Sequence, residues 1–199
     1  MESVYRPRVE APFGYYHVGT RGNDRRPIFV DDRDRLIFLL FVSRVARKYG
    51  WSLYAYCLMT NHYHLVVQIS NRGLSRGMCE LNGGYAIGFN ARHGHANHVF
   101  GRRFWDSRIE RDSYLLEACR YVVLNPVRAA LCAEPVDWPW SSYRACSGLE
   151  LPRTQLALGE LLGFFSADPA TAHRAYIRFV SEGHGGRQPP RPGGERGVT

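Results

Sequence analysis

The sequence lacks any apolar run long enough to cross a membrane. Its longest unbroken apolar stretch, residues 36–42 (LIFLLFV), falls far short of the roughly 20 residues that a spanning helix needs. The first residues, MESVYRPRVEAPF, also lack the apolar segment of a secretory signal peptide. We therefore expect a cytoplasmic protein that does not associate with membranes.

Cysteine is sparse as well, and its spacing excludes two small-domain architectures. The five cysteines are odd in number, widely separated and contain no CxxC pair. This pattern fits neither a disulfide framework nor a zinc knuckle. The sequence also has no P-loop, so we expect no nucleotide cofactor.

Lysine is nearly absent, although the chain is strongly basic. Of the 26 basic residues, 25 are arginine and only Lys48 is lysine, and the formal charge is +8 with a pI of about 9.5. A charge of this size favours a polyanionic partner. Guanidinium groups suit phosphate, although a codon bias would produce the same arginine excess.

The apolar periodicity predicts an α+β fold with one main domain. The order of the expected elements is β-α-β-β-α-β, which is that of a ferredoxin-like antiparallel sheet with helices packed on one face and a C-terminal extension. The expected strands cover 14–24, 51–59, 62–70 and 102–110, and the helices cover 31–50, 74–90 and a stretch that starts at Asp112 or Ser113. The glycine pair at 83–84 weakens the middle of the second helix.

The C-terminal part is expected to differ from the main domain. We assign residues 1–146 to the main domain and 147–182 to a helical extension, with helical pieces near 155–164 and 168–180. The last 17 residues, 183–199, hold nine glycines or prolines and no core-forming pattern. This composition predicts a disordered tail.

Two histidines stand one residue apart at the head of an apolar strand, in the stretch TNHYHLVVQIS. Alternate residues of a strand share a face, so His62 and His64 lie roughly 6.5 to 7 Å apart at Cα, close enough to chelate one ion. A pair of partly buried, hydrogen-bonded histidines is the simpler alternative, and the short pattern alone does not decide between them.

A second polar pair lies on the helix around RYVVLNPVRAAL. Tyr121 and Asn125 are four residues apart and therefore share one helical face. Each also has a structural interpretation. Asn125 followed by proline is a good helix cap, and Tyr121 can be a core aromatic.

Two arginine-rich segments are candidates for contacts with nucleic acid. TRGNDRR and GRRFWDSR mix guanidinium groups with aromatic rings, as proteins that bind single strands do. Solvated loops and a buried strand are the structural alternative. The candidate DNA-binding residues are Arg21, Asn23, Arg25, Arg102, Arg103, Phe104 and Arg108.

Taken together, LMTNHYHLVVQ, YLLEACRYVVLNPVRAAL and WPWSSYRA resemble the REP-associated tyrosine transposases, which belong to the HUH single-tyrosine transposase superfamily. The resemblance runs in order over roughly residues 8 to 146. It implies that His62, His64 and Asn125 bind a divalent cation, Mg²⁺ or Mn²⁺, and that Tyr121 is the nucleophile. It also implies cleavage and rejoining of single-stranded DNA at palindromic repeat hairpins through a 5′-phosphotyrosine.

Three other functions are compatible with parts of the sequence. A non-catalytic protein that binds single-stranded DNA or RNA hairpins would use the same sheet, but it would need neither Tyr121 nor Asn125. A zinc hydrolase could be built on the three histidines of RHGHANH, His93, His95 and His98, although no carboxylate base lies beside them. A replication initiator or relaxase shares the chemistry, but it normally carries further domains.

Overall fold

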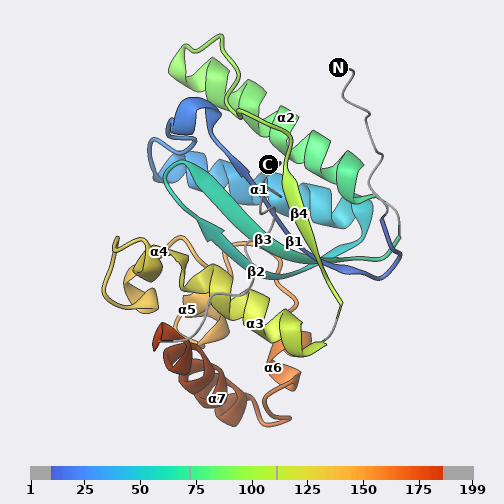
Figure 1. Ribbon diagram of the computed structural model, residues 1–199, viewed down its shortest axis with the longest axis vertical. Coiled ribbons are helices and arrows are strands. Elements are labelled where there is room, and N and C mark those ends of the chain that lie inside the picture. The colour runs from blue at the N-terminus through green and yellow to red at the C-terminus, as the bar shows by residue number, and fades with distance from the viewer. Residues whose placement is uncertain (1–9, 72, 111, 186–199) are drawn as a thin grey trace, which may run out of the picture.

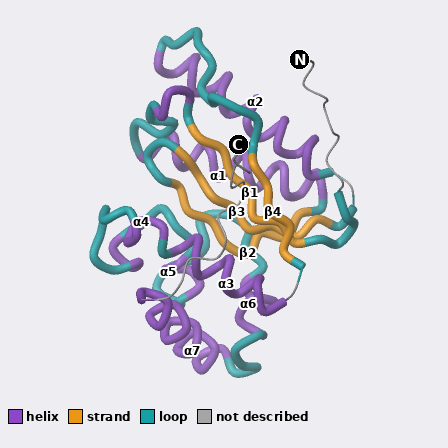
Figure 2. Tube along the Cα trace, in the orientation of Figure 1, coloured by secondary structure: helices purple, strands orange, loops and turns teal. Residues whose placement is uncertain are grey.

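The four strands form one antiparallel sheet at the centre of the molecule (Figures 1 and 2). The computed structural model describes residues 10–71, 73–110 and 112–185. The sheet order is β2-β3-β1-β4, as expected for a ferredoxin-like fold. The strands are β1 (Tyr15–Arg21), β2 (Trp51–Leu58), β3 (His62–Ile69) and β4 (Trp105–Ile109).

Two long helices, α1 (Asp32–Tyr49) and α2 (Leu74–His93), cover one face of the sheet. Asp31 caps α1 by accepting a hydrogen bond from the Asp34 amide at 3.0 Å, and Gly50 ends the helix in the left-handed region at φ 64°. The core between these helices and the sheet contains Phe38 and Tyr63, whose ring centroids are 4.5 Å apart. The layer of helices predicted from the sequence is therefore confirmed.

The glycine pair at 83–84 does not interrupt α2, which runs unbroken through both positions. Gly84 lies against α1, where an added Cβ would be 2.6 Å from the Phe41 ring. Nothing lies within 4 Å of the corresponding position at Gly83. The first glycine of the pair is thus open to solvent, and the second allows the two helices to approach each other.

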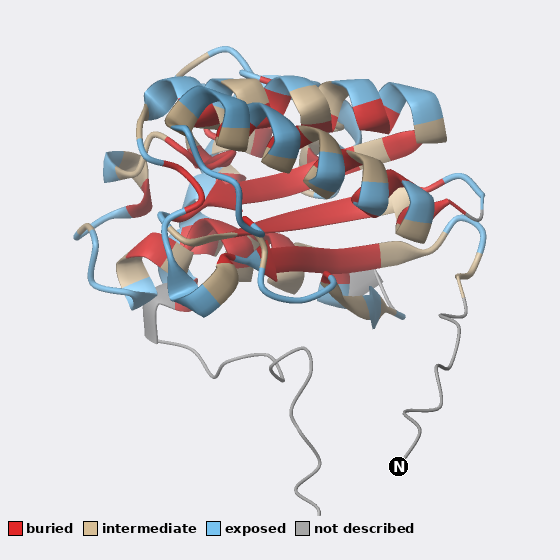
Figure 3. Ribbon diagram, turned by 90° about the horizontal axis from the view of Figure 1, so that it is seen from above, coloured by how far each residue is buried: buried red, intermediate tan, exposed pale blue. Residues whose placement is uncertain are grey.

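The opposite face of the sheet is also covered, so the sheet lies between two helical layers (Figure 3). This second layer corrects the expectation that the helices pack on one face only. Its helices are α3 (Asp112–Val123), α4 (Asn125–Arg128), α5 (Tyr143–Cys146), α6 (Leu158–Gly163) and α7 (Pro169–Ser181). Leu115 and Cys119 of α3 share one apolar cluster with Val66 of β3 and Tyr176 of α7. The expected C-terminal extension therefore contributes to the core that holds α3.

Short 3₁₀ helices complete the described chain at Asn23–Arg25, Pro135–Asp137 and Glu182–Gly185. The last of them occupies the start of the predicted disordered tail, which corrects that expectation for residues 183–185. Residues 186–199 lie outside the described residues. Within the described ranges, no helix combines the length and apolar character that crossing a membrane requires.

A buried carboxylate ties the start of α1 to the end of α2. Asp34 is 1% exposed and accepts hydrogen bonds from the Val30 amide at 2.8 Å, from Arg92 and from His93 Nε2 at 3.0 Å. Burial alone would raise the pKa of Asp34, but these hydrogen bonds from His93, Val30 and Arg92 lower it overall. The ionised form of Asp34 therefore stabilises the fold.

We expect Asp34→Ala to lower the free energy of unfolding by about 2–4 kcal/mol, because it leaves the Val30 amide without its acceptor and removes one of the two carboxylates that Arg92 bonds, the other being Asp31. In the wild type, ionised Asp34 contributes fully to stability when the pH is above about 3.9, the pKa of an aspartate in the unfolded chain. This contribution is lost as the pH falls through the lower pKa that Asp34 has in the folded protein. Urea titrations at pH 7 and at acidic pH measure both effects. Asp32→Asn, which alters an exposed carboxylate, is the control and should change stability by less than about 0.5 kcal/mol.

Candidate active site

The register of the sheet places both histidines on the face that α3 covers. In the antiparallel pair of β1 and β3, Gly19 lies opposite His64 and Arg21 lies opposite His62. Tyr63, between the two histidines, points to the other face and is fully buried against α1 and α2. The predicted alternation of the HYH stretch is therefore what the structure shows.

The two imidazole rings lie close together and nearly perpendicular, with centroids 5.1 Å apart and an interplanar angle of 82°. His62 Nδ1 is 2.7 Å from Asn61 Oδ1, and because an amide oxygen only accepts, the ring nitrogen is the donor. This bond fixes the His62 tautomer with its proton on Nδ1. The lone pair of His62 is then on Nε2.

His64 is buried, with 7% of its surface exposed, and its two ring nitrogens have different surroundings. Nδ1 is 3.0 Å from Nε2 of His17, a β1 residue that the sequence analysis did not assign to the site. Nε2 is buried and has no hydrogen-bond partner among the described residues. A buried nitrogen without a partner is unfavourable for stability alone and is an observation that calls for a ligand.

Burial keeps all three imidazoles neutral at physiological pH. It lowers the pKa of His17 to about 3. Burial, together with the charge of Arg21, lowers the pKa of His62 to about 4. The pKa of His64 lies well below its ordinary value, mainly because of burial. A neutral imidazole is the form that binds a metal ion.

The ring of Tyr121, on α3, packs against this cluster. Its ring centroid is 5.7 Å from that of His17 and 6.2 Å from that of His64, and the guanidinium carbon of Arg128 lies 4.9 Å from its centre. Tyr114, earlier on the same helix, is 56% exposed. Of the two tyrosines on α3, Tyr121 is the one that contacts the histidines.

Asn125 lies at the junction of α3 and α4, where proline breaks the helix hydrogen bonding. Pro126 has no amide hydrogen, and the Asn125 side-chain nitrogen donates instead to the carbonyls of Tyr121 at 3.0 Å and Val122 at 3.5 Å. The cap residue of α4 is Leu124, so the interpretation of Asn125 as a helix cap is wrong. Both of these hydrogen bonds use the amide nitrogen of Asn125, and the carbonyl oxygen is the end that can bind a hard cation.

Trp105 of β4 covers the imidazole cluster from the side, a position that its place in GRRFWDSR did not predict. Its ring centroid is 4.8 Å from that of His17 and 5.3 Å from that of His64. The indole fits because Gly19 lies beneath it: an added Cβ there would be 2.3 Å from the Trp105 ring and 2.3 Å from the Tyr63 carbonyl oxygen. Gly19 and Trp105 together shape one wall of the site.

His62 Nε2, His64 Nε2 and the Asn125 carbonyl oxygen are the donors that could hold a divalent cation here. Two imidazole nitrogens and one amide oxygen are a donor set that Mg²⁺ tolerates and Mn²⁺ suits well. No cluster of three or more His, Cys, Asp or Glu suited to a metal ion occurs among the described residues. The structure does place a carboxylate, Asp34, beside His93, but Arg92 and the Val30 amide also donate to it. Because no metal-binding cluster includes these histidines among the described residues, the structure does not favour a zinc hydrolase.

The two arginine-rich segments lie side by side, although they are far apart in the sequence. The Gly101 amide donates to the Arg21 carbonyl at 3.2 Å, and the Asn23 amide donates to the Val99 carbonyl at 2.9 Å. The Gly22 amide donates to the Asn61 carbonyl at 2.8 Å, which joins them to the end of the sheet where His62 lies. Arg21, Arg25, Arg102 and Arg103 are exposed, and Asn23 is half-buried.

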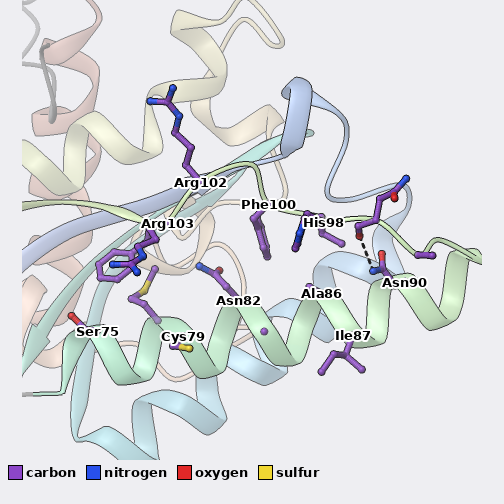
Figure 4. A pocket seen from close by; sticks show the side chains of 16 residues that line it. Ser75, Cys79, Asn82, Ala86, Ile87, Asn90, His98, Phe100, Arg102 and Arg103 are labelled. Atoms are coloured by element: carbon purple, nitrogen blue, oxygen red, sulfur yellow. Dashed lines mark hydrogen bonds between the residues drawn. The ribbon is translucent and has the colours of Figure 1, made fainter. Parts of the chain in front are cut away.

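A groove of about 940 Å³ runs between α2 and the segment before β4 (Figure 4). Arg103 lies over α2 on the wall of this groove, whereas Arg102 points away from the helix. Phe104 is buried in the core between the sheet and the helices, which corrects the expectation that its ring stacks on a base. Arg108 is exposed but lies opposite Tyr16, so it faces the α1 and α2 side, away from the histidines.

Comparison with known protein families matches residues 13–123 to the IS200-like transposases. A comparison with curated proteins finds no match.

Among solved structures, a REP-associated tyrosine transposase bound to a REP hairpin is similar at 20% identity and a TM-score of 0.61, covering 76% of this chain and 90% of that one. A candidate transposase from Deinococcus radiodurans is similar at 16% identity and a TM-score of 0.42, covering 55% of this chain and 90% of that one. A tRNA(His) guanylyltransferase from Saccharomyces cerevisiae is similar at 11% identity and a TM-score of 0.46, covering 90% of this chain and 79% of that one. Only the first of these bears on the fold, and it has the same architecture.

We expect Gly19→Ala to destabilise the protein by about 1–3 kcal/mol, because the new methyl group must displace the Trp105 ring or the β3 backbone. Thermal unfolding and the fluorescence of the indole measure the two effects. Gly83→Ala is the matched control. It adds the same methyl group where nothing lies within 4 Å and, in a helix, should raise stability by up to about 1 kcal/mol. Equal effects of the two changes would contradict the close fit at Gly19.

Proposed function

Because the chain belongs to the IS200-like transposases, we propose that it cleaves and rejoins single-stranded DNA through a 5′-phosphotyrosine formed on Tyr121. The observation that carries this proposal is the contact of Tyr121 with the buried imidazole cluster, in which His64 Nε2 has no protein partner. An aromatic side chain that only fills the core does not need buried imidazoles with a free nitrogen as neighbours, whereas a nucleophile that acts beside a bound cation does.

In the proposed reaction, the Tyr121 hydroxyl oxygen attacks the phosphorus of a DNA phosphodiester. The bond from Tyr121 Oη to phosphorus forms, the bond from phosphorus to the 3′ oxygen breaks, the phenol proton leaves and the 3′ oxygen takes up a proton. The energy of the phosphodiester is kept in the phosphotyrosine, so a 3′ hydroxyl can reverse the step on the same or another strand. No nucleotide cofactor is consumed.

His62, His64 and Asn125 would hold the cation, Mg²⁺ or Mn²⁺. When bound, it draws charge from the non-bridging phosphate oxygens and helps orient the phosphate for in-line attack. The chain itself supplies the neutral imidazoles, because burial keeps both histidines unprotonated. It also fixes the ring of His62 through Asn61 and holds Tyr121 on a helix packed against the same face of the sheet.

We infer that the DNA partner is a palindromic repeat hairpin with an unpaired flank. The REP-associated tyrosine transposase with the same fold is bound to a REP hairpin. Exposed arginines gather at the end of the sheet where His62 lies, and guanidinium groups suit phosphate. The proposed contacts are Arg21, Asn23, Arg25, Arg102 and Arg103, with Arg108 further along the edge strand.

We expect Tyr121→Phe to abolish the covalent adduct between protein and DNA, because the change removes the attacking oxygen and keeps the ring. Incubation with a labelled repeat hairpin and Mg²⁺ or Mn²⁺, followed by denaturing electrophoresis, measures the adduct as a slow-migrating band. Hairpin affinity should stay within about twofold of the wild type.

Tyr114→Phe is the control and should form the adduct at the wild-type rate. A band that persists in Tyr121→Phe and vanishes in Tyr114→Phe would assign the nucleophile to the other tyrosine. If the wild type binds hairpins but forms no adduct with any of them, the protein is a binding protein without strand-cleaving activity.

Hairpin affinity should fall steeply with salt, with a log-log slope of about −3 to −4 for about four to six phosphate contacts. Arg102→Ala should make this slope shallower by about 0.7 and weaken binding equally across flanking sequences. Fluorescence anisotropy between low and moderate salt measures both. Arg178→Ala, an exposed arginine on α7, is the control and should leave the slope unchanged. A change in sequence preference in Arg102→Ala would instead indicate a base contact.

A further inference from the structure

The two histidines of the proposed cation site are held in the same way. In each ring Nδ1 meets a neighbouring side chain, Asn61 for His62 at 2.7 Å and His17 for His64 at 3.0 Å. In neither ring does Nε2 have a protein partner among the described residues. Asn61 can only accept through its oxygen, so the bond fixes the proton of His62 on Nδ1. His17 can play the same part for His64.

The hydrogen bond between His17 Nε2 and His64 Nδ1 contains one proton, which belongs to one of the two rings. Which ring carries it determines whether Nε2 of His64 has a proton or a lone pair. If His17 donated, His64 would carry its proton on Nε2, as a buried N–H with no acceptor in the described chain. If His64 donates, its Nε2 holds a lone pair directed away from His17. An unpaired buried N–H is the more costly arrangement, and only the lone pair can bind a cation.

We infer that His17 is a positioning residue whose Nε2 accepts a hydrogen bond from the Nδ1–H of His64, so that the His64 Nε2 lone pair faces the divalent cation. This inference rests on the proposed function only for the identity of the ligand. The hydrogen bond itself, and the tautomer that it sets, belong to the protein without metal.

The position of His17 in the sheet suits this part. It lies on β1 opposite Val66 on one side and Ser107 on the other, so strands flank it on both sides. Its ring is 6% exposed and meets the edge of the Trp105 indole at a centroid distance of 4.8 Å. A group that orients a metal-binding histidine is worth about 10- to 100-fold in metal affinity, and a rigid strand holds it better than a loop.

The tautomer can be measured directly in the metal-free, full-length protein. Long-range proton–nitrogen spectra of a sample labelled with ¹⁵N-histidine distinguish a protonated Nδ1 from a protonated Nε2, and His64→Ala identifies the His64 signals by their loss. The inference requires the Nδ1–H form for His64. The Nε2–H form, which free histidine prefers, would overturn it whatever the function of the protein.

Mn²⁺ affinity, measured by the loss of the free-ion electron paramagnetic resonance signal, tests the consequence. His17→Leu removes the acceptor and should weaken Mn²⁺ binding by about 10- to 100-fold. His17→Gln keeps an acceptor oxygen and should restore most of the affinity. Thr20→Val is the matched control. It removes a buried β1 hydroxyl that bonds Tyr63 and Asn82 on the other face, so it should lower the melting temperature and leave Mn²⁺ affinity unchanged.

The outcomes separate this inference from the proposed function. If His64→Ala abolishes Mn²⁺ binding but His17→Leu and Thr20→Val both bind as the wild type does, His17 is only structural and the inference fails, while the cation site stands. If His64→Ala binds Mn²⁺ like the wild type, the proposed cation site fails, and the role of His17 toward it fails too.

Discussion

The antiparallel register of β1 and β3 is the constraint on which the site depends. Because side chains alternate between the faces of a strand, a shift of one residue would turn His62 and His64 into the core and Tyr63 out of it. Packing on both faces of the sheet stabilises this register. On one face Tyr63 is fully buried against Phe38, and on the other the Trp105 ring lies over Gly19, which is opposite His64. Packing on one face of the sheet therefore determines the chemistry available on the other.

The second face obtains its order from residues that come much later in the chain. Helix α3 packs on β2 and β3 and is covered in turn by α7, with Tyr176 fully buried in the shared cluster. The break at Pro126 then turns the chain, and the Asn125 side chain satisfies carbonyls at the end of α3. Tyr121 is thus placed by a helix whose two sides are both in contact with protein.

The sequence predicted the sheet, α1, α2 and α3 well, because each has clear periodicity and clear end signals such as Asp31 and Gly50. It also predicted that the two histidines share a face, and that Tyr121 and Asn125 share another. It did not indicate His17, and it placed Trp105 only among the aromatic rings of an arginine-rich segment, not beside the histidines. His17 and Trp105 lie at the site because β1 pairs with β3 and β4. In the sequence, only the alternation of residues along each strand indicated which face of the sheet they occupy. Phe104 lies just before β4, outside the paired residues, so neither alternation nor pairing marked its ring as part of the core.

The cover that α7 provides for α3 also has a consequence in time. Strands β1 to β4 and α3 are synthesised before α7, yet the apolar side of α3 has no complete cover until Tyr176 and Val180 have been made. Domains generally fold as units once their core residues are available. A nascent chain that ends before α7 would already contain the strands that carry the histidines, whereas α3, which carries Tyr121, would lack part of its packing. The contact between Tyr121 and the imidazole rings would then form only after α7 has been synthesised.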